Sequence, residues 1–499
     1  MKKTVSAFFA AAIICAALIC LPCCQSADKS GGKNESETKA GQTENPNSAA
    51  SPEGGAQDIT ERLYPDLPEV KFDGYEMKFL TRNEKHMIFL SKDIFAAEEN
   101  GDVVNDAVYK RNSVIEDKYG ARVTMEAVEN PYVFIQKLIS SGDCPYDAMI
   151  EATLGTVTLS AKNMLVDLKT VPNLDFEKPW WDQTLAGELT IAGKLFCAVG
   201  DLIIADKDGT WGLLFNKNIM KDYGLEDPYK LVEEGKWTVD KFYEMSKRVS
   251  VDLNGDGKYD VTDDKFGFAT EPYNIFVMTI GADCRIAEKD ENDLPVLSVN
   301  NQRFLTIREK AVEIDKDISA INASRVTGAA SGDPFYGGII PAFDDGRIMF
   351  YMGSMALVPL FRGMEQDFGI LPIPKFDEQQ QKYRTTMSVF NNGAVYIPTT
   401  NGDLERTGIL LEALCAESAY TLRPAYYEIT LKTKLSRDDE SSAMLDILFA
   451  NRIIDVGALY NFGGVLELVT GGKSDFISGY EKLEQKAAAA IQKLAEQFE

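Results

Sequence analysis

Between Tyr75 and Ile150 the chain alternates between strand-like and helix-like segments, and this alternation restricts the possible folds more than any other feature of the sequence. In chain order the segments are residues 76–80, 102–119, 122–128, 132–140 and 146–150. The first, third and fifth are short apolar runs, whereas the second and fourth carry apolar residues at helical spacing. This β-α-β-α-β order predicts a parallel sheet covered by helices. Because ligands of such sheets lie beyond the carboxyl ends of the strands, residues 81–83 and 151–153 are expected at a binding site.

Length and charge narrow the possible partners. The chain has 499 residues, enough for two or three cores, and a formal net charge of -25 at pH 7. This charge argues against nucleic acid and anionic lipid head groups, which would be repelled, and favours neutral molecules or cations. The single histidine, His86, excludes a metal site with two His ligands and leaves one candidate base for a Ser-His or Cys-His hydrolase. The composition therefore leans away from hydrolytic enzymes.

Residues 1–24 form a sorting signal, in which Lys2 and Lys3 precede an uncharged apolar run that ends in Leu21-Pro-Cys-Cys24. The segment resembles a bacterial lipoprotein signal, whose terminal cysteine is acylated and becomes the new N-terminus. That resemblance implies Cys24 as the lipid anchor, with Cys23 as the alternative acceptor. A cleaved secretory peptide followed by incidental cysteines is the other interpretation.

Residues 25–60 are expected to be a disordered tether. No Val, Ile, Leu, Met or aromatic residue occurs between Gln25 and Asp58, so this stretch cannot bury enough apolar surface to offset the entropy of ordering it. It would hold a globular body on the order of 30 Å from its lipid. Signal and tether together predict a protein anchored to the outer face of the bacterial cell membrane.

The four cysteines beyond the leader are isolated, and no C-x-x-C pair indicates zinc or a redox motif. They are Cys144, Cys197, Cys284 and Cys415. We expect them to be small buried hydrophobes, although one long-range disulfide remains open in an oxidising compartment.

Several short motifs occur in order along the chain after Asp175. They are Lys178-Pro-Trp-Trp-Asp182, Leu189-Thr-Ile-Ala-Gly-Lys-Leu195, Trp211-Gly-Leu-Leu-Phe-Asn-Lys217, Pro228-Tyr, Gly235-Lys-Trp-Thr238, 343–349, Gly353-Ser354, Gly369-Ile-Leu-Pro-Ile-Pro-Lys375 and Tyr426-Tyr427. In this combination the sequence resembles the extracellular solute-binding proteins of ABC importers, family 1, the sugar-binding type. The resemblance covers about residues 70–499.

The resemblance implies a two-lobed, periplasmic-binding-protein-like α/β fold, with a helix-flanked sheet in each lobe and a hinge that the chain crosses more than once. On this basis residues 61–207 and 388–435 form the first lobe, and residues 208–387 and 436–499 the second. Crossings are expected near Asp206 to Thr210 and near Ser388 to Gly393. A contiguous two-domain arrangement is the alternative.

Six residues are candidates for ligand contacts: Asn83, Glu151, Asp208, Trp211, Tyr273 and Ser354. The first two follow from the strand ends, and the other four lie where the resemblance implies ligand segments. Sugar recognition needs an aromatic face for the pyranose ring, with carboxylates and amides for its hydroxyls. Core packing is the alternative for each, and it is the expectation for Trp180 and Trp181, since adjacent residues seldom face one cleft.

Residues 252–263 match a twelve-residue calcium loop. The predicted ligands are Asp252, Asn254, Asp256, Lys258 through its carbonyl, Asp260 and Asp263. Position 12 is Asp263 rather than the usual Glu, which makes bidentate closure less certain. We predict a structural calcium ion, and an acidic Asn-Gly turn without metal is the alternative.

These features predict a monomeric, lipid-anchored receptor that has no catalytic residues. It would capture a sugar or oligosaccharide between closing lobes and deliver it to the permease of an ABC importer. A surface enzyme that acts on glycans through a carboxylate pair is the alternative, which turnover would reveal. A surface adhesin with a vestigial cleft is a third possibility, and it would show no saturable binding.

Overall fold

A computed structural model describes residues 62–83, 91–325, 335–361, 363–427, 438–472 and 475–498. The chain divides into two compact units, 1–52 and 53–499, and the structure below belongs to the second. The predicted leader, the anchor Cys24, the tether and His86 lie outside the described residues. Among the described residues, no helix is long and apolar enough to span a bilayer.

The first sheet has four strands in the spatial order β12-β3-β1-β2. They are β1 (Tyr75–Arg82), β2 (Ala121–Val128), β3 (Ala148–Glu151) and β12 (Ala394–Tyr396). β1 is parallel to both β2 and β3, whereas β12 joins β3 antiparallel. The predicted β-α-β-α-β unit and its parallel sheet are therefore confirmed.

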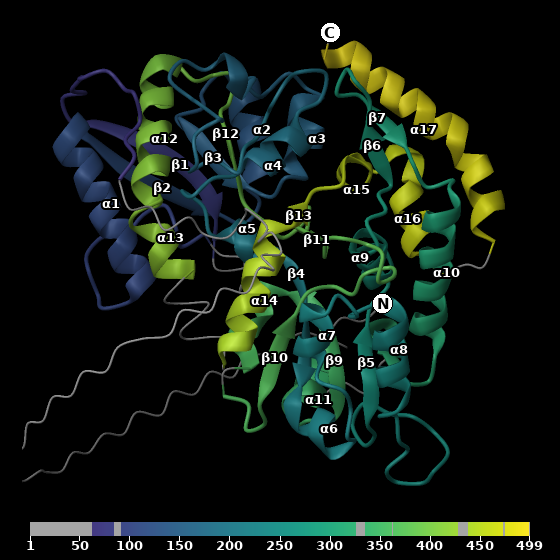
Figure 1. The fold of residues 1–499 in the computed structure, drawn as a ribbon. Coiled ribbons are helices and arrows are strands. Elements are labelled where there is room, and N and C mark those ends of the chain that lie inside the picture. Colours follow the sequence, from purple (N-terminus) through teal and green to yellow (C-terminus); the bar gives the residue numbers. More distant parts are fainter. Residues whose placement is uncertain are drawn as a thin grey trace, which may run out of the picture. The chain divides into compact units, whose positions relative to one another are not determined.

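Helices α1 (Val103–Tyr119) and α2 (Pro131–Ser141) are the crossovers of this sheet. Asp102 caps α1 by accepting the N–H of Val104 at 3.1 Å and that of Asn105 at 3.0 Å. Gly120 ends the helix with φ 62°, a left-handed conformation that glycine adopts without strain. Figure 1 shows α12 (Leu404–Ser418) lying beside α1, with which it is in contact.

The second sheet has five strands in the order β10-β4-β9-β5-β8 and is mixed. They are β4 (Trp211–Asn216), β5 (Phe266–Thr270), β8 (Ala320–Asn322), β9 (Ile348–Ser354) and β10 (Phe368–Leu371). All residues of β4, β5 and β9 are buried, as expected for strands covered on both faces. The helices of this part are α6 (Lys217–Asp222), α7 (Pro228–Glu233), α8 (Val239–Lys247), α9 (Tyr273–Gly281), α10 (Gln302–Lys316), α11 (Ile340–Asp344) and α14 (Asp439–Ala450).

Each sheet has its own core, and a third cluster joins them. Phe79 and Ile150 belong to the core of the first sheet, and Phe268 to that of the second. The third cluster contains Val108 of α1 together with Leu214 of the second sheet. We use first lobe and second lobe for the two sheets with their covering helices. The strands of each sheet fall within the residue ranges predicted for that lobe, while the boundaries between lobes stay a prediction.

The two predicted hinge crossings lie side by side. The N–H of Ser388 donates to the carbonyl of Gly209 at 2.9 Å, and Thr210 and Met387 form an antiparallel bridge. A Cβ at Gly209 would lie 2.2 Å from the carbonyl oxygen of Asn391, so the two chain segments meet at backbone contact. Strands β11 (Thr385–Thr386) and β13 (Arg452–Ile453) pair in parallel at the same place.

Two arginines hold α4 (Gln183–Leu189) of the first lobe. Arg452 donates to Asp182, the N-cap residue of α4, at 2.8 Å and to Asp206 at 2.7 Å. Arg285 forms a two-point ion pair with Glu188, one bond of which is 2.7 Å. The lobes are thus joined by charge pairs as well as by crossing backbone.

The C-terminal helix α17 (Phe476–Phe498) contacts both lobes. At its start, the ring of Phe476 lies 5.9 Å from that of Phe304 in α10. At its end, Phe498 lies 4.9 Å from Phe196, and Gln497 donates to the carbonyl of Ser160 at 2.7 Å. Helix α16 (Val465–Thr470) also contacts α17, and α15 (Val456–Tyr460) contacts α16, β6 (Ala287–Lys289) and β7 (Pro295–Leu297).

Trp180 and Trp181 are buried core residues, as predicted. Both indole N–H groups donate to Glu412 of α12, at 2.9 and 2.8 Å. Burial raises the pKa of Glu412 to about 7 despite these donors. The four cysteines are free, and all but the partly exposed Cys144 are buried.

Candidate functional site

The carboxyl ends of β1 and β3 present a buried charge pair. Oε1 of Glu151 accepts the N–H of Ala152 at 2.7 Å and lies 3.6 Å from Nε of Arg82. Arg82 also donates to the carbonyl of Asn392. The two charged side chains are only 2% and 8% exposed. The predicted ligand residue Glu151 is therefore already paired within the protein, whereas Asn83 is half-buried at the same edge.

Asn392 completes this edge from a distant part of the chain. Its Oδ1 accepts the N–H of Thr153 at 2.8 Å, and its Nδ2 donates to the Thr153 hydroxyl at 3.0 Å. Asn392 is fully buried. Both Arg82 and Asn392 lie in predicted segments, residues 81–83 and the crossing at 388–393, but neither was selected individually from the sequence. The available signals were the place of Arg82 at a strand end and that of Asn392 in a predicted crossing.

An aromatic cluster forms at the matching edge of the second sheet. Trp211 begins β4 and is the register partner of Ser354, which ends β9. Tyr273 begins α9 just after β5, and its ring centroid lies 5.4 Å from that of Trp211. The ring of Phe390 lies 6.1 Å from that of Tyr273. The structure thus brings together three predicted residues, Trp211, Tyr273 and Ser354, and adds Phe390.

Several polar groups of this cluster lack partners. Trp211 is 7% exposed, and its Nε1–H and the hydroxyl of Tyr273 are buried without a hydrogen bond to any described residue. Glu271, two residues before Tyr273, is partly buried, and among the described residues no group donates to its carboxylate. Burial raises the pKa of Glu271; burial, with the charges of Asp455 and Glu271, raises the pKa of Tyr273. Because buried polar groups are normally hydrogen-bonded, these groups indicate a place for a ligand.

The crossing segment between β11 and β12 connects the two edges. Ser388 bonds to Gly209 next to the second sheet, and the carbonyl of Val389 accepts the N–H of Leu154 at 3.1 Å beyond β3. Phe390 follows with 44% of its surface exposed. A half-exposed ring between two sheet edges is suited to contact a ligand. Sequence reasoning identified this segment as a crossing but did not select Phe390 or Glu271.

Asp208 lies in a different environment from the other candidate ligand residues. Its carboxylate accepts a hydrogen bond from the hydroxyl of Tyr426, and burial raises its pKa to about 6. Tyr426 belongs to the third cluster, which joins the lobes. The structure therefore gives Asp208 a protein partner at the junction of the lobes.

The side chains of the predicted calcium loop turn toward its own backbone. Asp252 accepts the N–H groups of Gly255 and Gly257 at 2.7 and 2.8 Å. The fully buried Asp264 accepts two further backbone N–H groups across the loop, each at 2.8 Å. Within the described ranges, no three His, Cys, Asp or Glu side chains are grouped as metal ligands. Calcium therefore stays a prediction, and Asp264, which sequence reasoning did not select, takes part in closing the loop.

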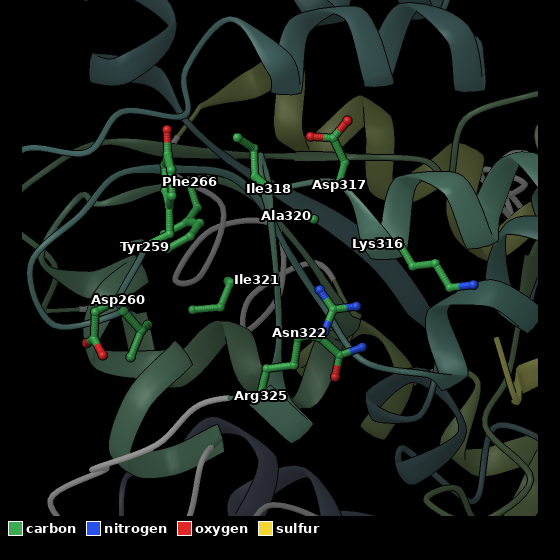
Figure 2. A pocket seen from close by; sticks show the side chains of 11 residues that line it. Tyr259, Asp260, Phe266, Lys316, Asp317, Ile318, Ala320, Ile321, Asn322 and Arg325 are labelled. Carbon is green, nitrogen blue, oxygen red and sulfur yellow. The ribbon is translucent and has the colours of Figure 1, made fainter. Parts of the chain in front are cut away.

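A separate pocket of about 210 Å³ lies beside β8. Figure 2 shows Tyr259, Phe266 and Ile321 on its apolar wall, with Arg325 at one end. Asp260 lines this pocket and is also a predicted calcium ligand. The pocket lies next to the calcium loop and is distinct from the aromatic cluster at the start of β4.

No family model matches the sequence, and no curated protein matches it. Solved structures do match. A cyclo/maltodextrin-binding protein complexed with maltotetraose is 12% identical, with a TM-score of 0.54 over 85% of this chain and 97% of that one. An ABC substrate-binding protein from Listeria monocytogenes in complex with cycloalternan is 12% identical, with a TM-score of 0.50 over 85% of this chain and 99% of that one.

A third similar structure is a sugar transporter from Rhizobium etli in an open conformation, 12% identical, with a TM-score of 0.51 over 85% of this chain and 98% of that one. These matches show the fold: a two-lobed α/β arrangement of helix-flanked sheets, like that of ABC substrate-binding proteins. The predicted fold class and the resemblance are confirmed at this level. The similar structures are binding and transport proteins rather than enzymes.

Proposed function

We propose that the protein is the substrate-binding component of an ABC importer, which captures a sugar or oligosaccharide between two lobes and delivers it to the membrane permease. One observation carries the proposal. The buried Trp211 Nε1–H and Tyr273 hydroxyl have no acceptor among the described residues, and they lie beside an aromatic surface at the edge where the lobes meet. Sugar hydroxyls would supply these acceptors, and a pyranose face would lie on the rings.

The proposal also covers where in the cell the protein is located. The lipid anchor at Cys24 and the tether would hold the protein, as a monomer, on the outer face of the membrane. Replacing Cys24 with Ser should release the protein from the membrane fraction. If it stays bound with Cys24 removed and Cys23 intact, the assignment of the anchor to Cys24 is wrong.

Ligand binding is tested by a thermal-shift screen against mono- and oligosaccharides, because a ligand that binds only the native state raises its melting temperature. For a sugar that binds, Trp211→Ala should weaken affinity about 5- to 150-fold, the effect of losing roughly 1 to 3 kcal/mol of buried aromatic contact. Trp211→Phe keeps an aromatic face but removes the N–H, which separates stacking from hydrogen bonding. Product formation from a glycan would instead favour an enzyme.

Closure is tested separately by small-angle scattering. A ligand closes the lobes only if it binds the closed state more tightly than the open one. The radius of gyration should therefore decrease when a sugar from the screen is added. An unchanged radius with saturable binding would contradict closure while leaving the binding function in place.

A further inference from the structure

We propose that the solute bound at the edge of the second sheet carries a protonated amine, as an amino sugar does, and that Glu271 selects it. This inference rests on the proposed function and names the substrate class for the same site. It starts from three features of the aromatic cluster: the position of Glu271, the charges around it and the rings beside it.

Glu271 lies two residues before Tyr273 of the aromatic cluster, and its charge acts on Tyr273. It follows β5 directly, and its backbone N–H is held by the side chain of Asn274 in α9 at 2.8 Å. Two residues on, Tyr273 contacts Trp211 and Phe390. The backbone bond fixes the main chain at Glu271, and the two carboxylate oxygens have no donor among the described residues.

Two acidic groups act on Tyr273 of the cluster. Besides burial, the groups that raise the pKa of Tyr273 are Asp455 and Glu271, both acidic. Burial is the one cause of the raised pKa of Glu271, and no neighbouring cation lowers it. At the edge of the first sheet, by contrast, Glu151 has the guanidinium of Arg82 within 3.6 Å. Among the described residues, Glu271 therefore has no cation of its own, whereas Asp455 is influenced by the charge of Arg285.

A protonated amine fits this site better than a hydroxyl alone. A hydroxyl can donate to the carboxylate but leaves its charge in place, and a partly buried charge is unfavourable without a counter-charge. An ammonium group donates hydrogen bonds to the carboxylate and also neutralises its charge. The faces of Trp211 and Tyr273 favour a cation nearby, and the net charge of -25 attracts one from solution.

The test compares matched sugars by calorimetric titration of the wild-type protein. The probes are glucosamine, galactosamine and a glucosamine trimer, each beside its neutral counterpart: glucose, galactose and cellotriose. N-acetylglucosamine and its trimer control for size, since acetylation removes the charge. Spermidine tests whether an amine without a sugar is sufficient. We expect the amino sugars to bind about 10- to 100-fold more tightly than the neutral ones, as for a charge-assisted hydrogen bond.

Glu271→Gln should reduce that preference to nearly none, because the amide keeps the shape and loses the charge. The protein should still fold, since the carboxylate makes no hydrogen bond with the described residues. Glu291→Gln makes the same charge change at an exposed position and should keep the full preference. Melting curves of both variants report on folding.

The outcomes separate the two proposals. Equal binding of amino and neutral sugars, or a preference that survives Glu271→Gln, overturns the role of the amine and leaves a sugar-binding protein. If no sugar of either series binds, the proposed function is overturned as well. If spermidine binds as tightly as the amino sugars, the carbohydrate part of the inference is wrong. A preference that disappears in Glu271→Gln and persists in Glu291→Gln supports the inference.

Discussion

The edges of the two sheets differ in their residues, mainly charged and amide side chains at the first and aromatic ones at the second, and in how their polar groups are satisfied. At the first edge, Arg82, Glu151 and Asn392 bond to one another or to backbone. At the second edge, Trp211, Tyr273 and Glu271 have buried or partly buried polar groups without hydrogen-bond partners among the described residues. At the first edge the hydroxyl of Thr81 and Nε of Arg82 also lack hydrogen-bond partners among the described residues, but the carboxylate of Glu151 has a cation. At the second edge, no described cation is paired with the carboxylate of Glu271.

This difference indicates that the two edges have different roles in folding and in binding. An edge whose charged side chains are paired within the protein is already ordered, and no further free energy is needed to organise it. It can therefore serve as the surface against which a solute is positioned. An edge with unpaired groups gains stability when a solute supplies the missing partners. We therefore expect changes at the first edge to affect folding most and changes at the second to affect binding most.

The largest expected effect is the loss of stability when Arg82 of the first edge is replaced. Arg82→Met keeps most of the side-chain volume but leaves Glu151 without its guanidinium and the Asn392 carbonyl without its donor. Breaking a buried ion pair on one side typically costs about 3 to 5 kcal/mol, so the urea midpoint should fall strongly. Glu271→Gln at the second edge should change the free energy of unfolding by less than about 0.5 kcal/mol. Similar losses in both variants would remove the distinction between the edges.

The next prediction concerns the joint between the edges. Gly209→Ala places a Cβ 2.2 Å from the Asn391 carbonyl oxygen, so the two crossing segments must separate. We expect a loss of about 1 to 3 kcal/mol, measured by urea unfolding, together with weaker sugar binding. Gly187→Ala is the matched control, since nothing lies within 4 Å of its added Cβ in α4. It should be neutral or stabilising by up to about 1 kcal/mol. A neutral Gly209→Ala would show that the crossings are not in tight contact.

Local patterns predicted much of the fold. Strand and helix periodicity located β1, α1, β2, α2 and β3, because these elements depend on residues close in sequence. The core positions of Trp180 and Trp181 were also predictable, since adjacent side chains seldom face one cleft. Their shared partner Glu412 was not, because it lies 232 and 231 residues away.

The site was predictable only in part. Trp211, Tyr273 and Ser354 were found through motifs, and their meeting follows from the order of strands in the second sheet. The pairing of Arg82 with Asn392 joins residues 310 apart, which no local pattern indicates. Likewise, Asp208 receives its bond from Tyr426, 218 residues later. Which acidic groups are paired and which are left for a ligand is decided by such long-range contacts.

A smaller effect should appear in the pH dependence of stability. Burial raises the pKa of Glu412 to about 7 and that of Asp201 and Asp455 to about 6. A carboxyl whose pKa is higher in the folded state favours folding when protonated, so its contribution is lost as the pH rises through the folded-state value. The melting temperature should therefore fall by a few degrees between about pH 5 and pH 8. Carboxyls whose pKa is lowered in the folded state, such as that of Asp206, change protonation below this pH range, so they do not oppose the trend.

Glu412→Gln should flatten the upper part of this slope, although it also weakens one of the two indole hydrogen bonds. The measurement is a series of melting curves across the pH range for wild type and variant. Glu291→Gln, an exposed change of the same kind, should leave the slope unaltered. A wild-type melting temperature that rises with pH across this range would show that other groups dominate the linkage.

The smallest expected effect concerns the loop from Asp252 to Asp263, where acidic groups already have backbone partners, as at the first edge. If calcium binds there, a free concentration about ten times its dissociation constant stabilises the fold by about 1.4 kcal/mol, or roughly 2 °C for a chain of this size. A chelator should lower the melting temperature by that amount, and Asp256→Ala should abolish the response. Asp264→Asn would instead weaken two backbone hydrogen bonds with or without the chelator, because its oxygens accept N–H groups across the loop. Equal chelator responses in wild type and Asp256→Ala would place any bound calcium elsewhere, and no response in wild type would favour the turn without metal.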